Sequence, residues 1–590
     1  MKRENELTII SCIRKEDFNE VNGFEIREKN VFEDWNLWLK LIAKEKFPVR
    51  MNFYGAWYRR KADGELNRAK NSNNKRAMEI ISNTAKTIKK TVEAIQYPKA
   101  DFNWEVIEDS VENVVNIKRA DNGKINLLMI IPWMVMGGAD KFNLDLIKRL
   151  DKNKYDVTIV STEPAINTYY QEFREYAHVY DLTTFIDQKY WLAFINYIIE
   201  KNNINVIMNT NSEIGYTMLP YLKAKHNEIP IIDYIHMEEW YNRNGGYSRD
   251  SSAVESAIDK TLTCNKNSEK ILAEHFGRNP KELNTVYIGV NEDEFNPRDY
   301  YRDEQRKVFG VDKEYVIGFI CRITEQKRPF LLLEVIKELK KKRNDFVFLV
   351  AGTGNLLSDV KAKVKELGIS ENIKFIGEIK ETQNFYIACD LTFNCSIKEG
   401  LALTAYESLA MGVPVISSDV GGQKELINED VGVIVPCLQK EEDIWDFNYS
   451  EDEIYQYVEG VNNIIENLET YNNNCRDRIL SGFTISQMVK NMSKEFEKVH
   501  DNPNKEKIEN GKQLEKNMEI VKELVTRGFS SIEPKYSWEC ESYNNYYGYK
   551  EYNYKMQLFK EKMWKNPMYR GFIKFLQKIG IISIIKKIKK

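Results

Sequence analysis

The feature that most constrains the fold is a repeated alternation of short, continuously apolar runs with longer amphipathic stretches. These runs recur through two successive parts of the chain, 124–300 and 301–482. They are INLLMIIP (125–132), YDVTIVS (155–161), INVIMN (204–209), IPIIDYIH (229–236), YVIGFIC (315–321), FVFLVAG (346–352), IKFIG (373–377), LTFNC (391–395), VPVIS (413–417) and VGVIV (431–435). Apolar strands separated by helices are typical of a parallel sheet covered on both faces. The pattern therefore predicts two doubly wound α/β domains facing a cleft, with ligands beyond the carboxyl ends of the strands.

The segment EGLALTAYESLAMGVPVISSDVGG (399–422) carries the strongest functional signal. Seven residues separate Glu399 from Glu407, with a small-residue turn and a predicted helix between them. Eight positions make a little over two helical turns, so we expect the two carboxylates near the same side, with Glu399 just before the helix and Glu407 within it. A carboxylate accepts hydrogen bonds from neighbouring hydroxyls, which suits the diols of a sugar and a ribose. Gly400 would place backbone N–H groups at a helix N-terminus, a site that favours phosphate.

This segment closely resembles the donor-site signature of the retaining glycosyltransferases of family 4. That family usually reads Glu-Gly-Phe-Gly where this chain has Glu-Gly-Leu-Ala (399–402). The resemblance covers about 124–500 and implies the GT-B fold, in which two Rossmann-like domains face a cleft. It also implies a nucleotide-diphosphate sugar as the donor substrate, with no separate cofactor. The residues that it places at the donor are Glu399, as a catalytic residue, and Gly400, Leu401, Ala402 and Glu407, as binding residues.

A glycine pair follows the first predicted strand, in PWMVMGGAD (132–140). This loop resembles the family's Gly-Gly-Ala-Glu turn, with Asp140 in place of the glutamate. Gly137 and Gly138 would let the backbone approach a ligand at the start of a helix. A tight turn is the simpler alternative for a Gly-Gly pair, but its place in a βα unit favours ligand contact.

Two cations follow the first predicted strand of the second domain, in GFICRITEQKRP (318–329). Arg322 and Lys327 match the spacing of the family's Gly-Arg-x-x-x-x-Lys pattern, with Cys321 at the usual glycine position. Fixed cations there would neutralise a diphosphate that gains charge as the glycosidic bond breaks. We therefore interpret both residues as catalytic diphosphate ligands.

His236 ends a predicted strand and is one of five histidines in the chain. A single histidine is more often structural than catalytic, but this one lies at a carboxyl strand end facing the predicted cleft. In the family, a histidine at this strand end contacts the donor sugar near the reaction centre, and we assign His236 that catalytic role. The run YIGVN (287–291) resembles the family's Pro-Asn-Gly-Val-Asp turn, which we interpret as a hinge into the second domain.

The resemblance implies transfer with retained anomeric configuration, by attack of the acceptor hydroxyl on the face that the nucleotide leaves. The leaving diphosphate then takes the acceptor proton, and the protein contributes positioning and positive charge. The sequence has no convincing Asp-x-Asp loop and no His/Cys cluster. We therefore expect a metal-independent, hexosyl-type transferase with no metal site.

Composition and charge restrict the partners and the compartment. The net charge of −3 gives no reason to expect nucleic acid. The eight cysteines form no Cys-x-x-Cys pair, which favours reduced thiols and a cytoplasmic protein over a disulfide framework. The first residues contain too short an apolar run for a signal peptide, and no stretch approaches 18 uninterrupted apolar residues.

The N-terminal residues 14–60 resemble the carboxyl-terminal part of a different family, the inverting family 2 glycosyltransferases with the GT-A fold. There, Glu-Asp-Trp-x-Leu-Trp-Leu carries the catalytic base, which would be Asp34 in EDWNLWL (33–39). A GT-A enzyme also needs an upstream nucleotide-binding half with a metal-binding Asp-x-Asp, for which this chain starts too late. We therefore interpret 1–75 as a truncated GT-A-like fragment and 76–123 as a helical, charged connector.

The C-terminal part begins with a predicted helix (483–500), which in the family closes the second domain and packs back on the first. The extension 501–590 starts polar, as a linker or exposed helix, and ends in a basic amphipathic helix. Residues 555–590 hold eleven Lys or Arg and one acidic residue. Such a helix suits an anionic membrane surface, which we assign to 565–590. The alternative is a helix whose apolar face covers the enzyme or a partner chain.

These features predict a retaining glycosyltransferase that moves a sugar from a nucleotide sugar to a glycan or lipid-linked acceptor. Its place would be surface polysaccharide or glycoconjugate synthesis, at the inner face of the cell membrane. One alternative is a GT-B nucleotide-sugar epimerase or phosphorylase, which product analysis would separate from transfer. Another is a non-catalytic scaffold or sugar-binding protein built from retired transferase domains. Four intact residues argue against retirement: Glu399, Glu407, Arg322 and Lys327.

Overall fold

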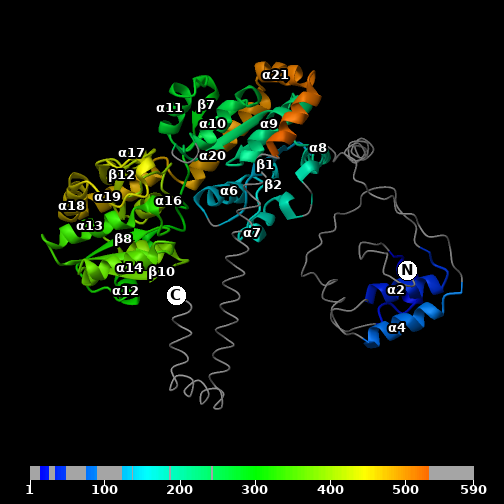
Figure 1. Cartoon of the computed structure of the whole chain (residues 1–590), viewed down its shortest axis with the longest axis horizontal. Helices are drawn as coiled ribbons and strands as arrows, with labels where there is room; N and C mark the ends of the chain where they lie inside the picture. Colours follow the sequence, from blue (N-terminus) through cyan, green and yellow to red (C-terminus); the bar gives the residue numbers. More distant parts are fainter. Residues whose placement is uncertain are drawn as a thin grey trace, which may run out of the picture.

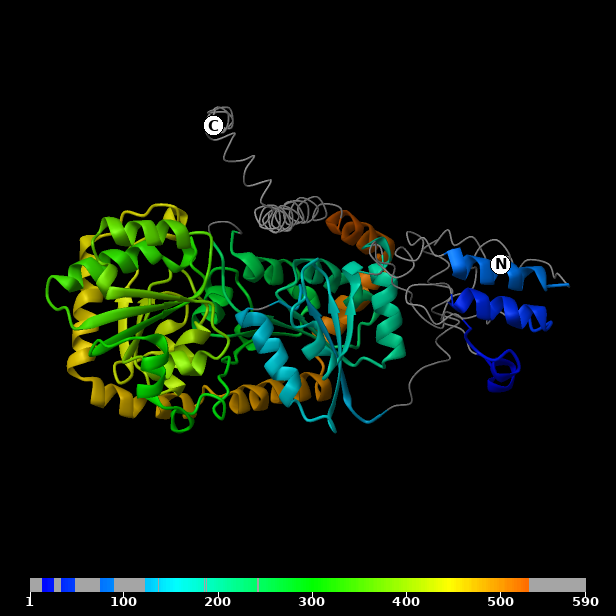
Figure 2. The ribbon, with the colours of Figure 1, turned by 90° about the horizontal axis from the view of Figure 1, so that it is seen from below.

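The computed structural model describes residues 13–25, 33–47, 75–89 and 122–529, apart from 136, 185, 187 and 241–243. Residues 122–529 form two α/β domains side by side, each built on a parallel sheet with helices packed on it (Figures 1 and 2). The predicted architecture of two doubly wound domains is therefore confirmed. None of the helices in the described ranges combines the length and apolarity needed to cross a bilayer.

The first domain contains a seven-stranded sheet in the order β3-β2-β1-β4-β5-β6-β7, and every pair in it is parallel. Its strands are β1 (Ile125–Ile131), β2 (Tyr155–Ser161), β3 (His178–Asp181), β4 (Val206–Thr210), β5 (Ile231–Ile235), β6 (Lys260–Thr263) and β7 (Leu283–Thr285). The order reverses between β1 and β4, which is where such a sheet opens a crevice for a ligand. The sequence predicts four of these strands and misses the short, polar β3, β6 and β7.

The second domain contains a six-stranded parallel sheet in the order β10-β9-β8-β11-β12-β13. Its strands are β8 (Tyr315–Ile320), β9 (Phe346–Ala351), β10 (Ile373–Gly377), β11 (Leu391–Asn394), β12 (Val415–Asp419) and β13 (Gly432–Pro436). All six coincide with predicted apolar runs, within two residues at each end. The reversal between β8 and β11 gives this sheet a second crevice, at the carboxyl ends of its strands.

Helices connect successive strands in both domains. In the first domain they are α6 (Gly138–Arg149), α7 (Tyr170–Arg174), α8 (Trp191–Lys201), α9 (Glu213–Lys225), α10 (Gly246–Ala253) and α11 (Lys266–Glu274). In the second domain they are α12 (Arg302–Phe309), which leads into β8, and α13 (Pro329–Lys340), α14 (Leu357–Glu366), α15 (Thr382–Ala388), α16 (Leu403–Ala410) and α17 (Gln423–Leu426). Helices α18 (Glu451–Glu466) and α19 (Leu468–Leu480) follow the last strand, β13. Strands β1, β4, β5 and β9 are buried along their whole length, because helices cover both faces of each sheet.

The chain returns from the second domain to the first through α20 (Ile485–Asp501), which runs along one side of both domains (Figure 2). It packs against α6, β1 and β4 of the first domain. The return starts where Thr484 forms a parallel β-bridge with Val290, so the two connections between the domains lie side by side. Helix α21 (Lys505–Glu515) then packs on α9, although the sequence suggested a linker or exposed helix there. The helical residues 518–529 follow, and Val521, Val525 and Phe529 join the core around α8.

The N-terminal part contains α1 (Lys15–Glu20), α2 (Glu33–Ala43) and α4 (Lys75–Lys86). Helices α2 and α4 pack together through a small core of Trp35, Leu39, Ile81 and Ile88. Asp34 lies in the first turn of α2, where its carboxylate accepts a hydrogen bond from the backbone N–H of Trp35 at 2.7 Å. The predicted basic helix at 565–590 lies outside the described residues.

A carboxylate of the second domain joins the two domains across the cleft. Glu425, on α17, accepts hydrogen bonds from the backbone N–H groups of Lys266 (2.8 Å) and Asn267 (3.0 Å), in the first turn of α11. It also accepts one from the Tyr287 hydroxyl at 2.9 Å. The first N–H groups of a helix have no partner within the helix, and a negative charge near them is stabilising. Glu425 therefore acts as a helix cap supplied by the opposite domain.

A second polar contact across the cleft lies beside the first. The Lys398 ammonium lies 2.8 Å from a Glu441 carboxylate oxygen of its own domain and 3.5 Å from one of Glu239 in the first domain. Gly400 is in direct contact with the first domain, since a Cβ there would lie 1.9 Å from the carbonyl oxygen of His236. The contacts made by Lys398, Gly400 and Glu425 set the distance between the two sheets along the edge where their crevices meet.

We predict that Glu425→Ala weakens the contact between the domains. Removing the cap leaves two N–H groups of α11 without their acceptor, which is expected to cost about 1–2 kcal/mol of unfolding free energy. Calorimetry should show a lower unfolding temperature, and small-angle X-ray scattering should show a larger radius of gyration. Glu429→Ala, at an exposed position three residues beyond α17, is the matched control. Equal behaviour of the two variants would show that Glu425 does not hold the domains.

Candidate active site

A cavity of about 510 Å³ lies between the two domains, at the carboxyl ends of both sheets. The first domain contributes residues that follow β1, β4 and β5, among them Trp133, Asn211 and His236. The second contributes residues that follow β8 and β11, among them Cys321 and Ser396. The cavity thus lies where the two strand-order reversals face each other, as expected for ligand sites in open α/β sheets.

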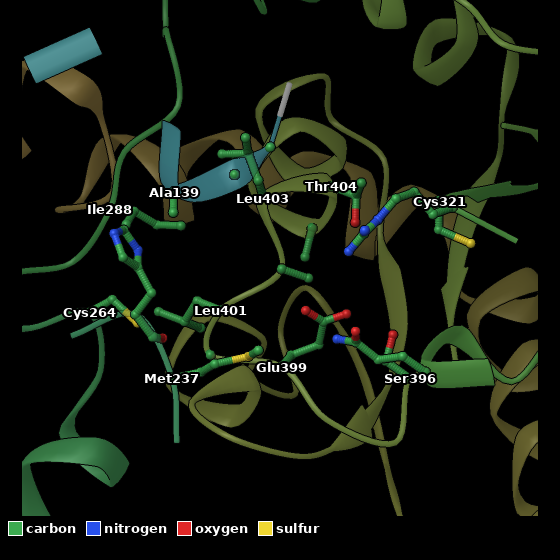
Figure 3. Close-up of a pocket in the computed structure, with 18 of the residues that line it drawn as sticks. Ala139, Met237, Cys264, Ile288, Cys321, Ser396, Glu399, Leu401, Leu403 and Thr404 are labelled. Atoms are coloured by element: carbon green, nitrogen blue, oxygen red, sulfur yellow. The ribbon is translucent and has the colours of Figure 1, made fainter. Parts of the chain in front are cut away.

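Nine of the ten predicted site residues line this cavity. They are His236, Arg322, Lys327, Glu399, Gly137, Gly138, Gly400, Leu401 and Ala402. Figure 3 shows the Glu399 carboxylate pointing toward the middle of the cavity, with Met237 and Cys264 on one side and Cys321, Ser396 and Thr404 on the other. The structure therefore brings together motifs that lie more than 260 residues apart, from Gly137 to Ala402.

Lys327 and Glu399 form an ion pair inside the cavity, with 17% and 11% of their side chains exposed. Lys327 ends a short 3₁₀ turn (Glu325–Lys327) after β8. The next residue, Arg328, is buried and held by the Cys395 carbonyl oxygen at 2.5 Å and by Glu453 at 2.8 Å. These buried contacts position the backbone from which the Lys327 side chain extends. Arg322 is exposed at the cavity edge, so its guanidinium is free to turn toward a ligand.

The loop 399–402 carries Glu399 to the start of α16. The carbonyl oxygen of Gly400 accepts a hydrogen bond from the N–H of Gly422 at 2.8 Å, and the N–H of Ala402 donates one to Gln423 at 3.1 Å. The contact of Gly400 with the His236 carbonyl leaves no space for a side chain at this position. The N–H groups of the first turn of α16, at the cavity-lining Leu403 and Thr404, have no acceptor within the helix. This helix end is suited to an anion.

Glu407 is the predicted site residue that is not among those lining the cavity. Helix α16 begins at Leu403, so Glu399 precedes the helix and Glu407 lies within it, as the sequence indicated. The buried Glu407 carboxylate accepts a hydrogen bond from the Tyr386 hydroxyl at 2.9 Å and lies 3.5 Å from that of Thr382. Burial raises the pKa of Glu407 from 4.5 to about 7, and nearby Lys141 of the first domain acts in the opposite direction. Its role as a ribose ligand stays a prediction.

His236 ends β5 and packs against aromatic rings of the first domain. Its ring centroid lies 5.1 Å from that of Phe142 and 4.8 Å from that of Tyr234. Burial lowers the pKa of His236 from 6.5 to about 3, so the imidazole is neutral near pH 7. Its Nε2 atom is buried without a hydrogen-bond partner. A neutral imidazole can give or take one hydrogen bond at this atom, depending on its tautomer.

The glycine turn before α6 also forms part of the wall. Gly137 is the N-cap of α6 and has an extended backbone, and Asp140 lies in the first turn of the helix. Burial raises the pKa of Asp140 from 3.8 to about 7, against the effect of hydrogen bonds from backbone N–H groups and from Trp133. Among the residues that the structure describes, no group of three or more His, Cys, Asp or Glu side chains is close enough to hold a metal ion.

Several polar or aromatic lining residues of the first domain were not predicted from the sequence, among them Trp133, Asn143, Asn211 and Tyr247. Asn211 directly follows β4, so the strand-end rule that found His236 could also have found it. Asn143 lies on α6, one turn after Asp140, on the same side of the helix. Tyr247 lies on the α10 segment that follows β5. Nothing in the local sequence of α10 distinguishes Tyr247 from an ordinary surface aromatic.

Comparison with known proteins agrees with this geometry. Residues 136–294 match the family model described as "Glycosyltransferase Family 4", and residues 301–447 match the one described as "Glycosyl transferases group 1". A glycosyltransferase from Rickettsia africae ESF-5 has a TM-score of 0.54 at 18% identity, over 64% of this chain and 99% of its own. Anabaena Alr3699/HepE in complex with UDP has a TM-score of 0.53 at 14% identity, over 63% and 100%. The double sheet with its interdomain cavity is thus the GT-B fold.

Relatives by sequence lie in the same class. The "Lipopolysaccharide core biosynthesis mannosyltransferase LpsB" of Rhizobium meliloti (strain 1021) is 34% identical over 163 residues, which are 26% of this chain and 46% of that protein. The matched region of this chain thus spans about half the length of this relative. A longer match is the "UDP-Gal:alpha-D-GlcNAc-diphosphoundecaprenol alpha-1,3-galactosyltransferase" of Escherichia coli. It is 20% identical over 391 residues, which are 63% of this chain and 96% of that protein. The chain therefore has the GT-B fold, with a first domain that matches the family 4 model and a second domain that matches the group 1 model.

We predict that Glu407→Gln changes how stability depends on pH. The folded-state pKa of about 7 lies above the ordinary 4.5, so folding favours the protonated carboxyl. This contribution is fully present below pH 4.5 and is lost as the pH rises through 7. A glutamine has no charge to bury, so the variant should gain on the order of 2 kcal/mol relative to the wild type between pH 5 and pH 8.

The measurement is the unfolding temperature of both proteins at the two pH values. The pKa of Asp140 is raised as well, but Asp140 is present in both proteins, so its effect on the pH dependence of stability cancels in the comparison. The exposed Glu429→Gln is the control for a change of surface charge. Parallel pH profiles for Glu407→Gln and the wild type would contradict a buried, proton-binding Glu407.

Proposed function

We propose that the protein is a retaining glycosyltransferase that moves a sugar from a nucleotide-diphosphate sugar to a glycan or lipid-linked acceptor. The observation that carries this proposal is the interdomain cavity in which Arg322, Lys327, Glu399 and the start of α16 come together. Two cations and a helix N-terminus suit a diphosphate, and a carboxylate beside them suits a sugar hydroxyl. The named relatives act in lipopolysaccharide core synthesis and on a diphosphoundecaprenol-linked sugar, and a structural neighbour was solved with UDP.

The proposed roles follow from where each group lies. Lys327 and Arg322 neutralise the diphosphate as it leaves, together with the first N–H groups of α16. Glu399 holds a hydroxyl of the donor hexose, and its ion pair with Lys327 keeps the two groups adjacent. Glu407, at the other end of the same loop and helix, binds the ribose. His236 offers one neutral hydrogen-bonding atom to the sugar from the opposite domain.

Retention follows if the acceptor hydroxyl attacks from the side on which the nucleotide leaves. The leaving diphosphate then takes the acceptor proton, and its negative charge is balanced by Arg322 and Lys327. On this mechanism no protein nucleophile is needed, and we propose that neither a metal ion nor a separate cofactor takes part. The contribution of the protein is to hold donor and acceptor in contact and to stabilise the leaving group.

The remaining parts of the chain are assigned by the same proposal. The basic segment 565–590 places the enzyme peripherally on the inner face of an anionic cytoplasmic membrane, where a lipid-linked acceptor would be. The N-terminal part around Asp34 is a GT-A-like fragment without its own catalytic function.

We predict that Lys327→Ala lowers sugar transfer by about 100-fold or more, because one fixed charge on the leaving group is removed. Glu399→Ala should act in the same direction, and added EDTA should not change the rate of transfer.

A panel of nucleotide sugars scored by thermal shift identifies the donor, since a ligand at 100 times its Kd adds about 2.7 kcal/mol of stability. Product analysis by mass spectrometry then separates transfer from epimerisation and phosphorolysis.

Lys337→Ala is the matched control, because Lys337 lies on α13 and pairs with Glu334 away from the cavity. A Lys327→Ala variant as active as this control would remove the proposed role of the cation. A reaction that stops in EDTA would contradict the metal-independent mechanism while leaving the transferase class intact.

We predict that deleting 565–590 abolishes sedimentation with anionic vesicles of phosphatidylglycerol and phosphatidylcholine. The deletion removes eight Lys or Arg, each expected to contribute about 1 kcal/mol near such a surface. Transfer to a water-soluble acceptor should continue, because the described residues that line the cavity all lie between Pro132 and Val415. Unchanged sedimentation of the shortened chain would rule out the membrane role of this segment.

A further inference from the structure

Three polar atoms on the first-domain wall of the cavity have no hydrogen-bond partner. They are Oδ1 of Asn143, Oδ1 of Asn211 and Nε2 of His236, and all three residues line the cavity. Asn143 is only 2% exposed. A buried polar atom without a partner costs about 1–3 kcal/mol, so most such atoms in proteins are paired. Three of them on one wall indicate a surface built to be paired by a ligand.

The three side chains come from neighbouring elements. Strands β4 and β5 pair in register, with Thr210 opposite Tyr234, so the residues that follow them lie side by side at the carboxyl edge. The His236 ring packs on Phe142, the residue before Asn143, which joins the helix to the same edge. Asn211 has φ = 55°, a left-handed conformation that few residue types adopt. Asparagine adopts this conformation more readily than most residues, which suits Asn211 to the turn that directly follows β4.

The two walls of the cavity differ in charge. Among the described lining residues, the cations are Arg322 and Lys327, and both belong to the second domain. The described first-domain lining contains no Lys or Arg, and its charged groups are the carboxyls of Asp140 and Glu239. A phosphate would meet cations on the second wall and carboxyls on the first. The first wall therefore suits a neutral ligand rich in hydroxyl groups, flanked by the aromatic side chains of Trp133 and Tyr247.

We propose that Asn143 and Asn211 bind hydroxyl groups of the acceptor, and that the acceptor end entering this cavity is a neutral sugar. This proposal rests on the proposed function, because it assigns the second-domain wall to the donor. Amide groups both donate and accept hydrogen bonds, so each can hold one hydroxyl of a sugar ring. A lipid diphosphate acceptor would then present its terminal sugar here and keep its phosphates outside this wall.

The test uses the full-length protein and two variants chosen to preserve the backbone. Asn211→Gly removes the amide at a position whose positive φ suits glycine, and Asn143→Leu replaces the buried amide by an apolar group of similar size. Asn203→Gly is the matched control, because Asn203 also has φ = 55° but lies before β4, at the opposite edge of the sheet. Thermal unfolding checks that all three variants fold.

The probes are UDP and a panel of neutral methyl glycosides, the methyl α-glycosides of glucose, galactose, mannose and N-acetylglucosamine. Binding is measured by saturation-transfer NMR, with each glycoside titrated in the presence and absence of saturating UDP. Each cavity variant should weaken the glycoside Kd by about 3- to 10-fold, the range expected for one lost hydrogen bond. The UDP Kd and the Asn203→Gly control should stay within about twofold of the wild type.

The outcomes separate this proposal from the function on which it rests. Failure of the wild type to bind any glycoside in the panel, or unchanged glycoside binding in both cavity variants, overturns the acceptor subsite. Weakening of UDP binding by the same factor would place the asparagines on the donor side and overturn it too. A wild-type protein that binds glycosides but no nucleoside diphosphate would instead refute the proposed transferase.

Discussion

The arrangement of the cavity depends on a carboxylate of one domain capping a helix of the other. Each sheet alone provides only half of the site, because the lining residues come from both. The two halves face each other at a fixed distance since Glu425 accepts the first N–H groups of α11 and Gly400 touches the backbone of His236. Glu425 lies on α17, whose N-cap is Gly422. The N–H of Gly422 donates a hydrogen bond to the carbonyl oxygen of Gly400 and so supports the loop 399–402. The contact between the domains and the geometry of the loop 399–402 therefore depend on the same short segment of the second domain.

Within the cavity, charge is divided between the two walls. The second domain supplies Arg322, Lys327 and a helix N-terminus, which suit an anionic leaving group. The first supplies a neutral imidazole and two amides with unpaired oxygens. This division suits a reaction in which one reactant carries a diphosphate and the other offers a hydroxyl. Outside the cavity lining, burial raises the pKa of Glu407 to about 7, and Lys141 of the facing domain only partly offsets this rise.

Much of the fold could be predicted from the sequence, because a strand buried on both faces needs a continuous apolar run. The runs that became β1, β2, β4 and β5 and all six strands of the second sheet are of this kind. The strands that were missed, such as KTLT and LNT, are short and polar, and they depend on neighbouring strands already in place. Nine residues that line the cavity could be picked out from the sequence because they belong to local motifs beside strand ends. Glu425 could not, since a cap supplied across the cleft has no signature in the sequence around either partner. Asn143 could not be predicted either, because its sequence position does not distinguish it from other asparagines on helices. It stands out only once the structure shows that its Oδ1 atom has no hydrogen-bond partner.

The path of the chain through α20 has a consequence for how the protein is made. The first sheet is complete in sequence by β7, but α20 and α21, which cover parts of that domain, come some 200 residues later. Met488, Met492 and Phe496 of α20 belong to the same core as β1 and α6. During synthesis, the surface of the first domain that α20 covers therefore stays without this cover until the second domain has been translated. A first domain expressed without the segment that contains α20 would therefore leave this apolar surface exposed to solvent.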